Sequence, residues 1–209
     1  MLVRDIMRSP VVTISPHTTL QDAYRIITEK GIRHLPVLDE GKLIGIITDR
    51  DLRLATSALS SFPFPPESQV KGVMRRSPLT ADPMDPVEDA ARVMRERKIG
   101  CLPVMSDGQL LGIITGIDLL DALMRLTGVD KPSGRLEVRL TYHPGELARL
   151  TGFLSRRDVN VHSILTYPDG PDHVRVVLRI GSIEDRRIAH DLRRSGFEVL
   201  WPPEKPCLR

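Results

Sequence analysis

Hydrophobic positions along residues 1–127 alternate between the period of a helix and that of a strand. The apolar runs HLPVL and KLIGIIT flank Asp39-Glu40-Gly41, and this arrangement predicts a β-hairpin. Another helix is expected after Thr48. Ahead of the hairpin, apolar residues at i, i+3, i+4 and i+7 predict a helix between a cap at Thr18 or Thr19 and an end at Gly31, with an apolar face of Leu20, Ala23, Tyr24 and Ile27.

The same succession of elements returns 67 residues later. Residues 45–52 read GIITDRDL and residues 112–119 read GIITGIDL, and the same offset relates Met7 to Met74. Residues 11–14 add a short strand before the first helix, so each copy is expected to read β-α-β-β-α. In the second copy Asp85 is the expected helix cap, with Pro86 at the first helical position. We therefore expect two copies of one supersecondary unit, packed as a pseudo-symmetric pair.

A different unit follows a Gly/Pro/Ser-rich stretch at residues 128–134, which is typical of a domain boundary. From LEVRLTY to FEVLW, strand and helix patterns succeed one another in the order β-α-β-β-α-β, the ferredoxin-like split βαβ arrangement. The sequence thus predicts an α+β protein. Its expected parts are two repeats at about 1–59 and 68–127, a linker at 128–134, a C-terminal domain at 135–201 and a tail at 202–209.

Composition excludes several classes of function. The net charge is only +3, no block of like charges occurs and aromatic residues make up 4%, so a nucleic-acid partner is not expected. Cys101 and Cys207 are far apart and the histidines lack ligand spacing, which argues against a disulfide framework and a metal site. No run of apolar residues approaches a membrane span. We expect a soluble cytoplasmic protein without a membrane partner.

The motif Thr-x-x-Asp occurs in both copies, as Thr48 with Asp51 and Thr115 with Asp118, where an apolar strand meets a helix. A carboxylate there can accept hydrogen bonds from the two hydroxyls of a ribose, and the free N–H groups at a helix start attract phosphate. The alternative is a capping box, in which Thr caps the helix and Asp reaches back. Their presence in two copies favours ligand binding.

These features resemble a known family. LPV, the G-I-I-T segment and Thr-x-x-Asp in both copies, with VRDIM at the start, are similar to tandem CBS domains, which bind adenosine nucleotides. Pro144-Gly145-Glu146-Leu147 and DVNVHSI make the third unit similar to an ACT domain, a small regulatory fold that often binds amino acids. The combination resembles acetoin-utilisation regulatory proteins of the AcuB type.

The resemblance implies two pockets, each shared between the repeats, with apolar residues around the adenine ring. Arg50 and Arg33 are candidate phosphate partners, with solvated surface arginines as the alternative. The two sites are expected to differ in occupancy. The first site would combine Ile46, Thr48, Arg50 and Asp51 with Val73, Ile99, Gly100 and Cys101. The second would combine Ile113, Thr115 and Asp118 with Ile6, Ile32, Arg33 and His34.

In the ACT-like unit, the resemblance implies a possible effector site at Gly145 and Asn160. Tyr142 departs from the family pattern, because amino-acid binders commonly carry Asn at that position. A dimerising spacer is the alternative to amino-acid binding for this unit.

No nucleophile, base or Gly-rich phosphate loop forms a catalytic constellation, so an enzyme is not expected. The leading expectation is a regulatory homodimer without a catalytic cofactor. It would sense AMP, ADP, ATP or S-adenosylmethionine and act through its ACT domain on an unidentified protein. The alternative is a dimeric interaction scaffold that regulates a metabolic enzyme with empty clefts.

Overall fold

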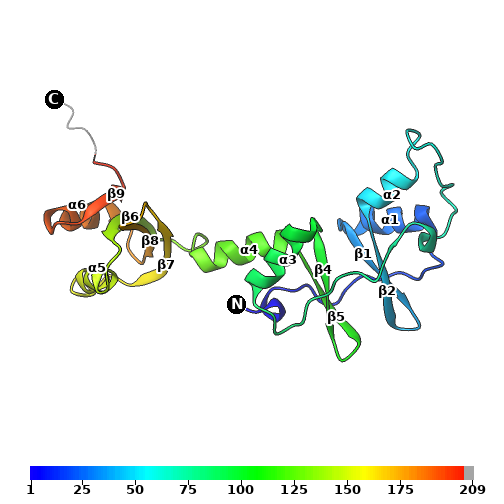
Figure 1. Ribbon diagram of the computed structural model, residues 1–209, viewed down its shortest axis with the longest axis horizontal. Helices are drawn as coiled ribbons and strands as arrows, with labels where there is room; N and C mark the ends of the chain where they lie inside the picture. The colour runs from blue at the N-terminus through cyan, green and yellow to red at the C-terminus, as the bar shows by residue number, and fades with distance from the viewer. Residues whose placement is uncertain (205–209) are drawn as a thin grey trace. The chain divides into compact units, whose positions relative to one another are not determined.

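The computed structural model describes residues 1–204; the end of the predicted tail, residues 205–209 with Cys207, lies outside the described residues. The chain divides into two compact units, Met1–Ala122 and the residues from Leu123 onward, and each is described by itself (Figure 1). The first unit contains η1 (Val3–Asp5), α1 (Leu20–Lys30), β1 (His34–Asp39), β2 (Lys42–Thr48), α2 (Asp49–Ala55), η2 (Val70–Gly72), β3 (Arg75–Arg76), α3 (Val87–Arg97), β4 (Cys101–Ser106), β5 (Gln109–Thr115) and the start of α4 (Gly116–Thr127).

The predicted repeat is visible in the boundaries of these elements. The helix α3 and the hairpin strands β4 and β5 begin and end 67 residues after α1, β1 and β2. Both hairpins turn through two residues with positive φ, 46° and 79° at Glu40 and Gly41 and 50° and 76° at Asp107 and Gly108. Positive φ at both central residues is the geometry of a tight hairpin turn, so the two predicted hairpins are confirmed.

Each copy packs its leading segment into the core of the other. Val3 is fully buried with Leu102 and Ile114 of the second copy, and Val70 is fully buried with Leu35 of the first. Exchanged segments tie the repeats together, because neither core is complete without residues from the other copy. This exchange places residues from both copies next to each hairpin.

A close approach at equivalent positions explains one pair of shared glycines. A Cβ atom at Gly45 would lie 2.6 Å from Met74 Sδ, and one at Gly112 would lie 2.7 Å from Met7 Sδ. Separations under 3.0 Å are not tolerated by real Cβ atoms. A larger residue at either position would therefore force the methionine side chain of the exchanged segment to move.

Two details of the predicted repeat are wrong. The strand expected at residues 11–14 is reduced to a single bridge between Ile14 and Val37, because Pro10 and Pro16 on either side lack the N–H groups needed to extend a ladder. The helix α3 begins at Val87 with Pro86 as its cap residue, one position later than predicted. The Asp85 carboxylate accepts a hydrogen bond from the Asp82 backbone N–H instead, at 2.9 Å. Thr19 is the cap of α1, and Gly31 ends it with φ 62°.

The second unit has the expected β-α-β-β-α-β order. Its four strands form an antiparallel sheet in the order β7-β8-β6-β9, the arrangement of a split βαβ fold. Leu136, Val138 and Leu140 of β6 are buried with Leu150 and Leu154, as the alternating pattern predicts. The elements are the end of α4, β6 (Gly134–Thr141), α5 (Glu146–Ser155), β7 (Val161–Pro168), β8 (His173–Ile180), α6 (Asp185–Arg194) and β9 (Glu198–Trp201).

Aromatic and arginine side chains close one side of this core. The rings of Phe153 and Phe197 meet edge to face at 5.8 Å, and the Arg149 guanidinium lies 3.9 Å from the Phe197 ring centre. Such contacts add stabilisation beyond burial of the rings alone. Within residues 1–204, no helix has both the length and the apolar character that crossing a bilayer requires.

Candidate functional site

Two neighbouring pockets open between the repeats of the first unit. The first pocket has a volume of about 550 Å³ and contains the Thr48–Asp51 motif at its wall, opposite Ile99, Gly100 and Cys101. The second pocket has a volume of about 400 Å³ and lies against Ile32, Arg33 and His34 of the first copy and Ile113 and Thr115 of the second. Both volumes are in the range of small-molecule sites.

The structure brings most of the residues predicted for the first site together. Val73 is the exception: it packs against the core of the first repeat and does not line the pocket. The residues that do line it, from the predicted set, are Ile46, Thr48, Arg50, Asp51, Ile99, Gly100 and Cys101. Both repeats therefore supply walls of one cavity.

The predicted second site is assembled less completely. Ile32, Arg33, His34, Ile113 and Thr115 line the second pocket, but Ile6 packs in the core of the second repeat. Asp118 does not line the pocket, because it lies behind the wall with its side chain only 3% exposed. The two copies of the motif thus meet different surroundings.

Asp51 has one carboxylate oxygen occupied and one open. Its Oδ2 accepts hydrogen bonds from the Thr48 backbone N–H at 3.1 Å and from the Thr48 hydroxyl at 2.7 Å. The Thr48 hydroxyl in turn accepts from the Asp51 N–H, so the predicted capping box is present. Within residues 1–204, its Oδ1 accepts no hydrogen bond, and Arg75 Nε lies 3.7 Å away. The cap orients the carboxylate while leaving Oδ1 available to a ligand in the first pocket.

Asp118 forms the same contacts with its own threonine, and its other oxygen is also occupied. Oδ2 accepts from the Thr115 N–H at 2.8 Å and from the Thr115 hydroxyl at 2.6 Å. Oδ1 accepts from Arg8 Nε at 2.7 Å. Both carboxylate oxygens of Asp118 are consequently engaged within the chain.

A third Thr-x-x-Asp, Thr19 with Asp22, shows what the motif does without a pocket. The Asp22 N–H donates to the Thr19 hydroxyl at 3.0 Å at the start of α1, and the Thr19 hydroxyl donates to Asp22 Oδ2 at 2.9 Å. Neither residue lines the two pockets between the repeats. The capping geometry alone therefore does not create a site, and the cavity beside Asp51 distinguishes that copy.

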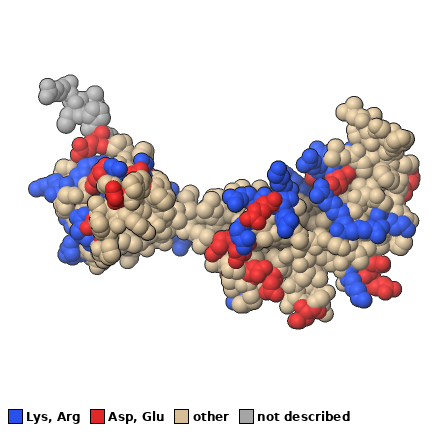
Figure 2. Space-filling view, in the orientation of Figure 1, with Lys and Arg blue, Asp and Glu red and all other residues tan. Residues whose placement is uncertain are grey.

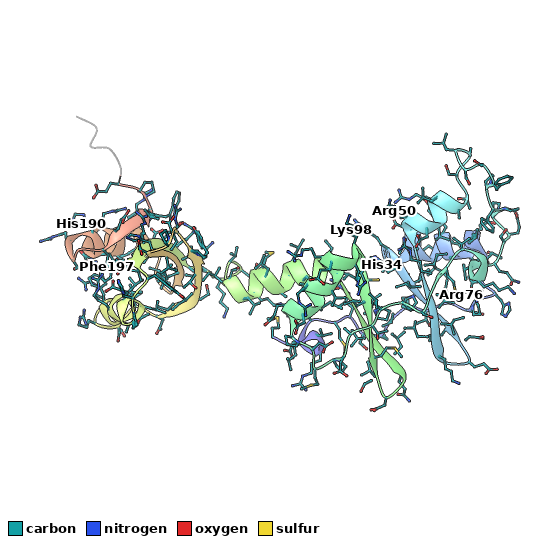
Figure 3. All side chains as sticks on the ribbon, viewed as in Figure 1. His34, Arg50, Arg76, Lys98, His190 and Phe197 are labelled. Atoms are coloured by element: carbon teal, nitrogen blue, oxygen red, sulfur yellow. The ribbon has the colours of Figure 1, made fainter. Side chains whose placement is uncertain are left out.

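His34 lies at the boundary of the two pockets and lines both (Figure 3). A Cβ atom at Gly100 would lie 2.8 Å from His34 Nε2, so glycine makes room for the imidazole. Burial lowers the pKa of His34, although the negative charge of Asp49 acts in the opposite direction. Burial thus favours the neutral form of the ring at the junction.

The apolar wall of the first pocket includes a cysteine. Cys101 is buried, at 7% exposure, and burial raises the pKa of its thiol to about 12. A thiol in this state is a small apolar wall residue and a poor nucleophile. Among residues 1–204, no three His, Cys, Asp or Glu side chains come together as a possible metal site.

Several pocket residues were missed by the sequence reasoning. Arg75, Arg76, Ser77 and Lys98 line the first pocket, and Arg8 and Lys30 line the second. A signal for two of them was present, because Arg8 and Arg75 each follow a methionine of the repeat, Met7 and Met74, at the same offset of 67. Lys98 carried no such signal, since its equivalent, Gly31, has no side chain.

The residues Gly145 and Asn160, predicted as a possible effector site, lie at opposite ends of the second unit's sheet. Gly145 follows the end of β6, where Thr141 pairs with His173. The Asn160 carbonyl accepts from the Gly181 N–H, beside the pair of Gly134 and Ile180. A single copy of the chain does not bring these two residues into one site.

Comparison with known proteins gives a consistent picture of the first unit. The model of the CBS domain matches residues 3–57 and 70–125. A CBS domain-containing protein of Dictyostelium discoideum is 40% identical over 60% of this chain and 92% of its own length. Other matches lie within enzymes: the chain spans 31% of the length of an inosine-5'-monophosphate dehydrogenase of Korarchaeum cryptofilum, at 31% identity.

Solved structures match the same part of the chain. The CBS domain pair of protein MJ0100, in complex with 5'-methylthioadenosine and S-adenosyl-L-methionine, is 31% identical over 63% of this chain and 98% of its own, with a TM-score of 0.54. The protein CBSX2 in complex with AMP is 30% identical over 60% and 97%, with a TM-score of 0.54. A Vibrio cholerae protein described as acetoin utilization protein AcuB is 32% identical over 63% and 98%, again with a TM-score of 0.54.

Proposed function

Since the chain belongs to the CBS domain family, we propose that it is a non-enzymatic regulatory protein that binds an adenosine-containing ligand in its first pocket. The complexes of related CBS proteins with AMP and with S-adenosyl-L-methionine support this ligand class. The relative from Dictyostelium discoideum, nearly all of which aligns with this chain, supports a protein that acts without an attached enzyme.

The observation that carries the proposal is the open oxygen of Asp51. Thr48 holds Oδ2, which fixes the plane of the carboxylate, and Oδ1 is free to accept hydrogen bonds from ribose hydroxyls. A hydrogen bond to a charged acceptor contributes about 1.5–3 kcal/mol. Ile46 and Cys101 offer the apolar surface that an adenine ring requires.

For the second unit we propose an ACT domain that passes the binding signal on. Its split βαβ order and the strand order β7-β8-β6-β9 support this assignment. A homodimer is proposed as the working form, because Ile117 and Leu120 of α4 leave apolar side chains exposed, at 55% and 56%. The likeness to the Vibrio cholerae protein supports a role in regulating metabolism, with acetoin utilisation as the first process to examine.

Calorimetric titration of protein freed of bound ligand tests the proposal. AMP, ADP, ATP and S-adenosylmethionine are titrated into the wild type, and the Asp51→Asn variant is expected to bind at least about tenfold more weakly. Asp22→Asn is the matched control, because Asp22 also exchanges hydrogen bonds with the threonine that caps its helix but lines neither of the two pockets. Absence of binding for all four ligands would overturn the proposed function.

A further inference from the structure

The first pocket carries an excess of positive charge. The cationic side chains along its wall are Arg33, Arg50, Arg75, Arg76 and Lys98, against two carboxylates, Asp49 and Asp51. Figure 2 shows Lys and Arg gathered over the region between the repeats. An adenosine moiety is uncharged, so its recognition does not account for this excess.

Most of these cations have no anionic partner among the residues that the structure describes. Within residues 1–204, Arg33, Arg50 and Lys98 form no salt bridge, whereas the carboxylate of Asp49 is held by Arg53 at 2.6 Å. Arg75 stays 3.7 Å from Asp51 Oδ1. The positive charge around the pocket is therefore not neutralised within the described chain.

The cations come from both copies of the repeat. Arg50 lies in α2, next in sequence to Asp51, and Lys98 follows α3 of the other copy (Figure 3). Arg33 ends the segment before β1 and also lines the second pocket. A ligand anchored at Asp51 would thus meet positive side chains on two walls of the same cavity.

The second pocket differs in this respect. Its cations are Arg8, Lys30 and Arg33, and Arg8 is engaged by Asp118 at 2.7 Å and by Asp121 at 3.9 Å. Only Lys30 and the shared Arg33 remain without a salt bridge among the described residues. The charge needed to hold several phosphates is concentrated at the first pocket.

We infer that the first pocket selects an adenine nucleotide with two or more phosphates, of the ADP and ATP class, with Arg50 and Lys98 as specificity-determining residues. This inference rests on the proposed function and narrows it. Each added phosphate brings negative charge that Arg and Lys can contact by charge-assisted hydrogen bonds. S-adenosylmethionine instead has a net positive charge, because its sulfonium and ammonium groups outweigh its one carboxylate, and this wall disfavours such a ligand.

The test compares ligands that differ only in phosphate number. Adenosine, AMP, ADP and ATP are titrated calorimetrically in buffer without divalent cations, so that the phosphates keep their charge. ATP is expected to bind at least about tenfold more tightly than AMP, a difference of about 1.4 kcal/mol, and to lose more affinity than AMP when salt is raised from 0.05 to about 0.5 M.

Variants then test whether Arg50 and Lys98 cause the preference for ATP. The double variant Arg50→Gln with Lys98→Gln is expected to reduce the ratio of ATP affinity to adenosine affinity at least about tenfold. Lys71→Gln is the matched control, because Lys71 is an exposed cation of the same unit that does not line the pocket. Circular dichroism and thermal unfolding establish that each variant is folded.

The outcomes separate this inference from the proposed function. Equal affinities for adenosine, AMP and ATP, or an unchanged ATP preference in the double variant, would overturn the inference and leave adenosine binding in place. Inorganic tripolyphosphate supplies the third arm: we expect it to compete with ATP for the wild type and not to bind the double variant. If tripolyphosphate binds while no nucleoside or nucleotide does, the proposed function fails and only a polyanion site remains.

Discussion

Arg8 and Arg75 occupy equivalent positions in the two repeats, yet only Arg8 closes on its aspartate. Arg8 Nε lies 2.7 Å from Asp118 Oδ1, and Arg75 Nε lies 3.7 Å from Asp51 Oδ1. In the second copy the guanidinium occupies the oxygen that a ribose would use. At Asp118, the Arg8 side chain thus takes the place that we propose for a ligand at Asp51.

Removing the Arg8 side chain is expected to allow a second nucleotide to bind. Arg8→Ala frees Asp118 Oδ1 towards the second pocket, and the stoichiometry of nucleotide binding should rise from one to two per chain. Because the Asp118 side chain is only 3% exposed, the variant leaves a buried carboxylate oxygen without its partner, and the accompanying loss of stability should be about 1–3 kcal/mol. Titration calorimetry measures the stoichiometry, and scanning calorimetry measures the stability. A stoichiometry that remains at one would contradict the prediction.

Substitution of Asp118 should mainly lower stability, whereas substitution of Asp51 should mainly weaken nucleotide binding. Asp118 is buried and fully hydrogen-bonded, so Asp118→Asn is expected to lower the free energy of unfolding by about 1–3 kcal/mol. Asp51→Asn should be less destabilising, because its side chain is 14% exposed and Oδ1 lacks a close partner, but it should remove most nucleotide binding. Urea unfolding and calorimetry of both variants check the contrast; equal loss of stability would argue against it.

The thiol of Cys101 is expected to react slowly in the folded protein. With a pKa raised to about 12, its thiolate fraction at pH 8 falls roughly a thousandfold below that of an ordinary cysteine, and alkylation by iodoacetamide should slow accordingly. The measurement uses a Cys207→Ser variant, so that one thiol is followed. Labelling in urea serves as the control, and equal rates with and without urea would refute the prediction.

Acidification should destabilise the first repeat through His34. Its pKa is lowered in the folded state, so the unfolded chain takes up a proton first as the pH falls through about 6.5. The contribution of the neutral His34 to the free energy of unfolding is complete above that pH and is lost as the pH falls below it. The free energy of unfolding then changes by at most about 1.4 kcal/mol per pH unit for one proton. Hydrogen exchange of β1 peptides between pH 7.5 and 5.5 measures it. His34→Gln should flatten the slope, and an unchanged slope would exclude His34 as its source.

The repeat and the hairpins could be predicted because they rest on local chemistry. Turn residues with positive φ, such as Gly41 and Gly108, leave a clear pattern, and the offset of 67 carries from the sequence into the element boundaries. The length of the strand at residues 11–14 could not be predicted from local sequence. The prolines on either side limit its pairing, but this shows only when its partner strand, which contains Val37, is known.

The site was predictable up to the motif and its opposing segment. Thr48, Asp51 and Cys101 line one pocket as the family resemblance implied. What the motif could not reveal is how Asp118 is occupied, since the bond from Arg8 joins residues 110 positions apart. The contribution of Lys98 was equally hidden, because it depends on the end of α3 facing a pocket of the other repeat.

The wall formed by Arg33, His34, Thr115 and Ile117 belongs to both pockets. A ligand that displaces this wall from one side changes the shape offered to a ligand on the other. Thermodynamic linkage then requires the influence to be reciprocal, with each ligand altering the affinity of the other by the same factor. In the Arg8→Ala variant, where both pockets would take a nucleotide, the affinity of the second binding event should therefore depend on whether the first pocket is filled.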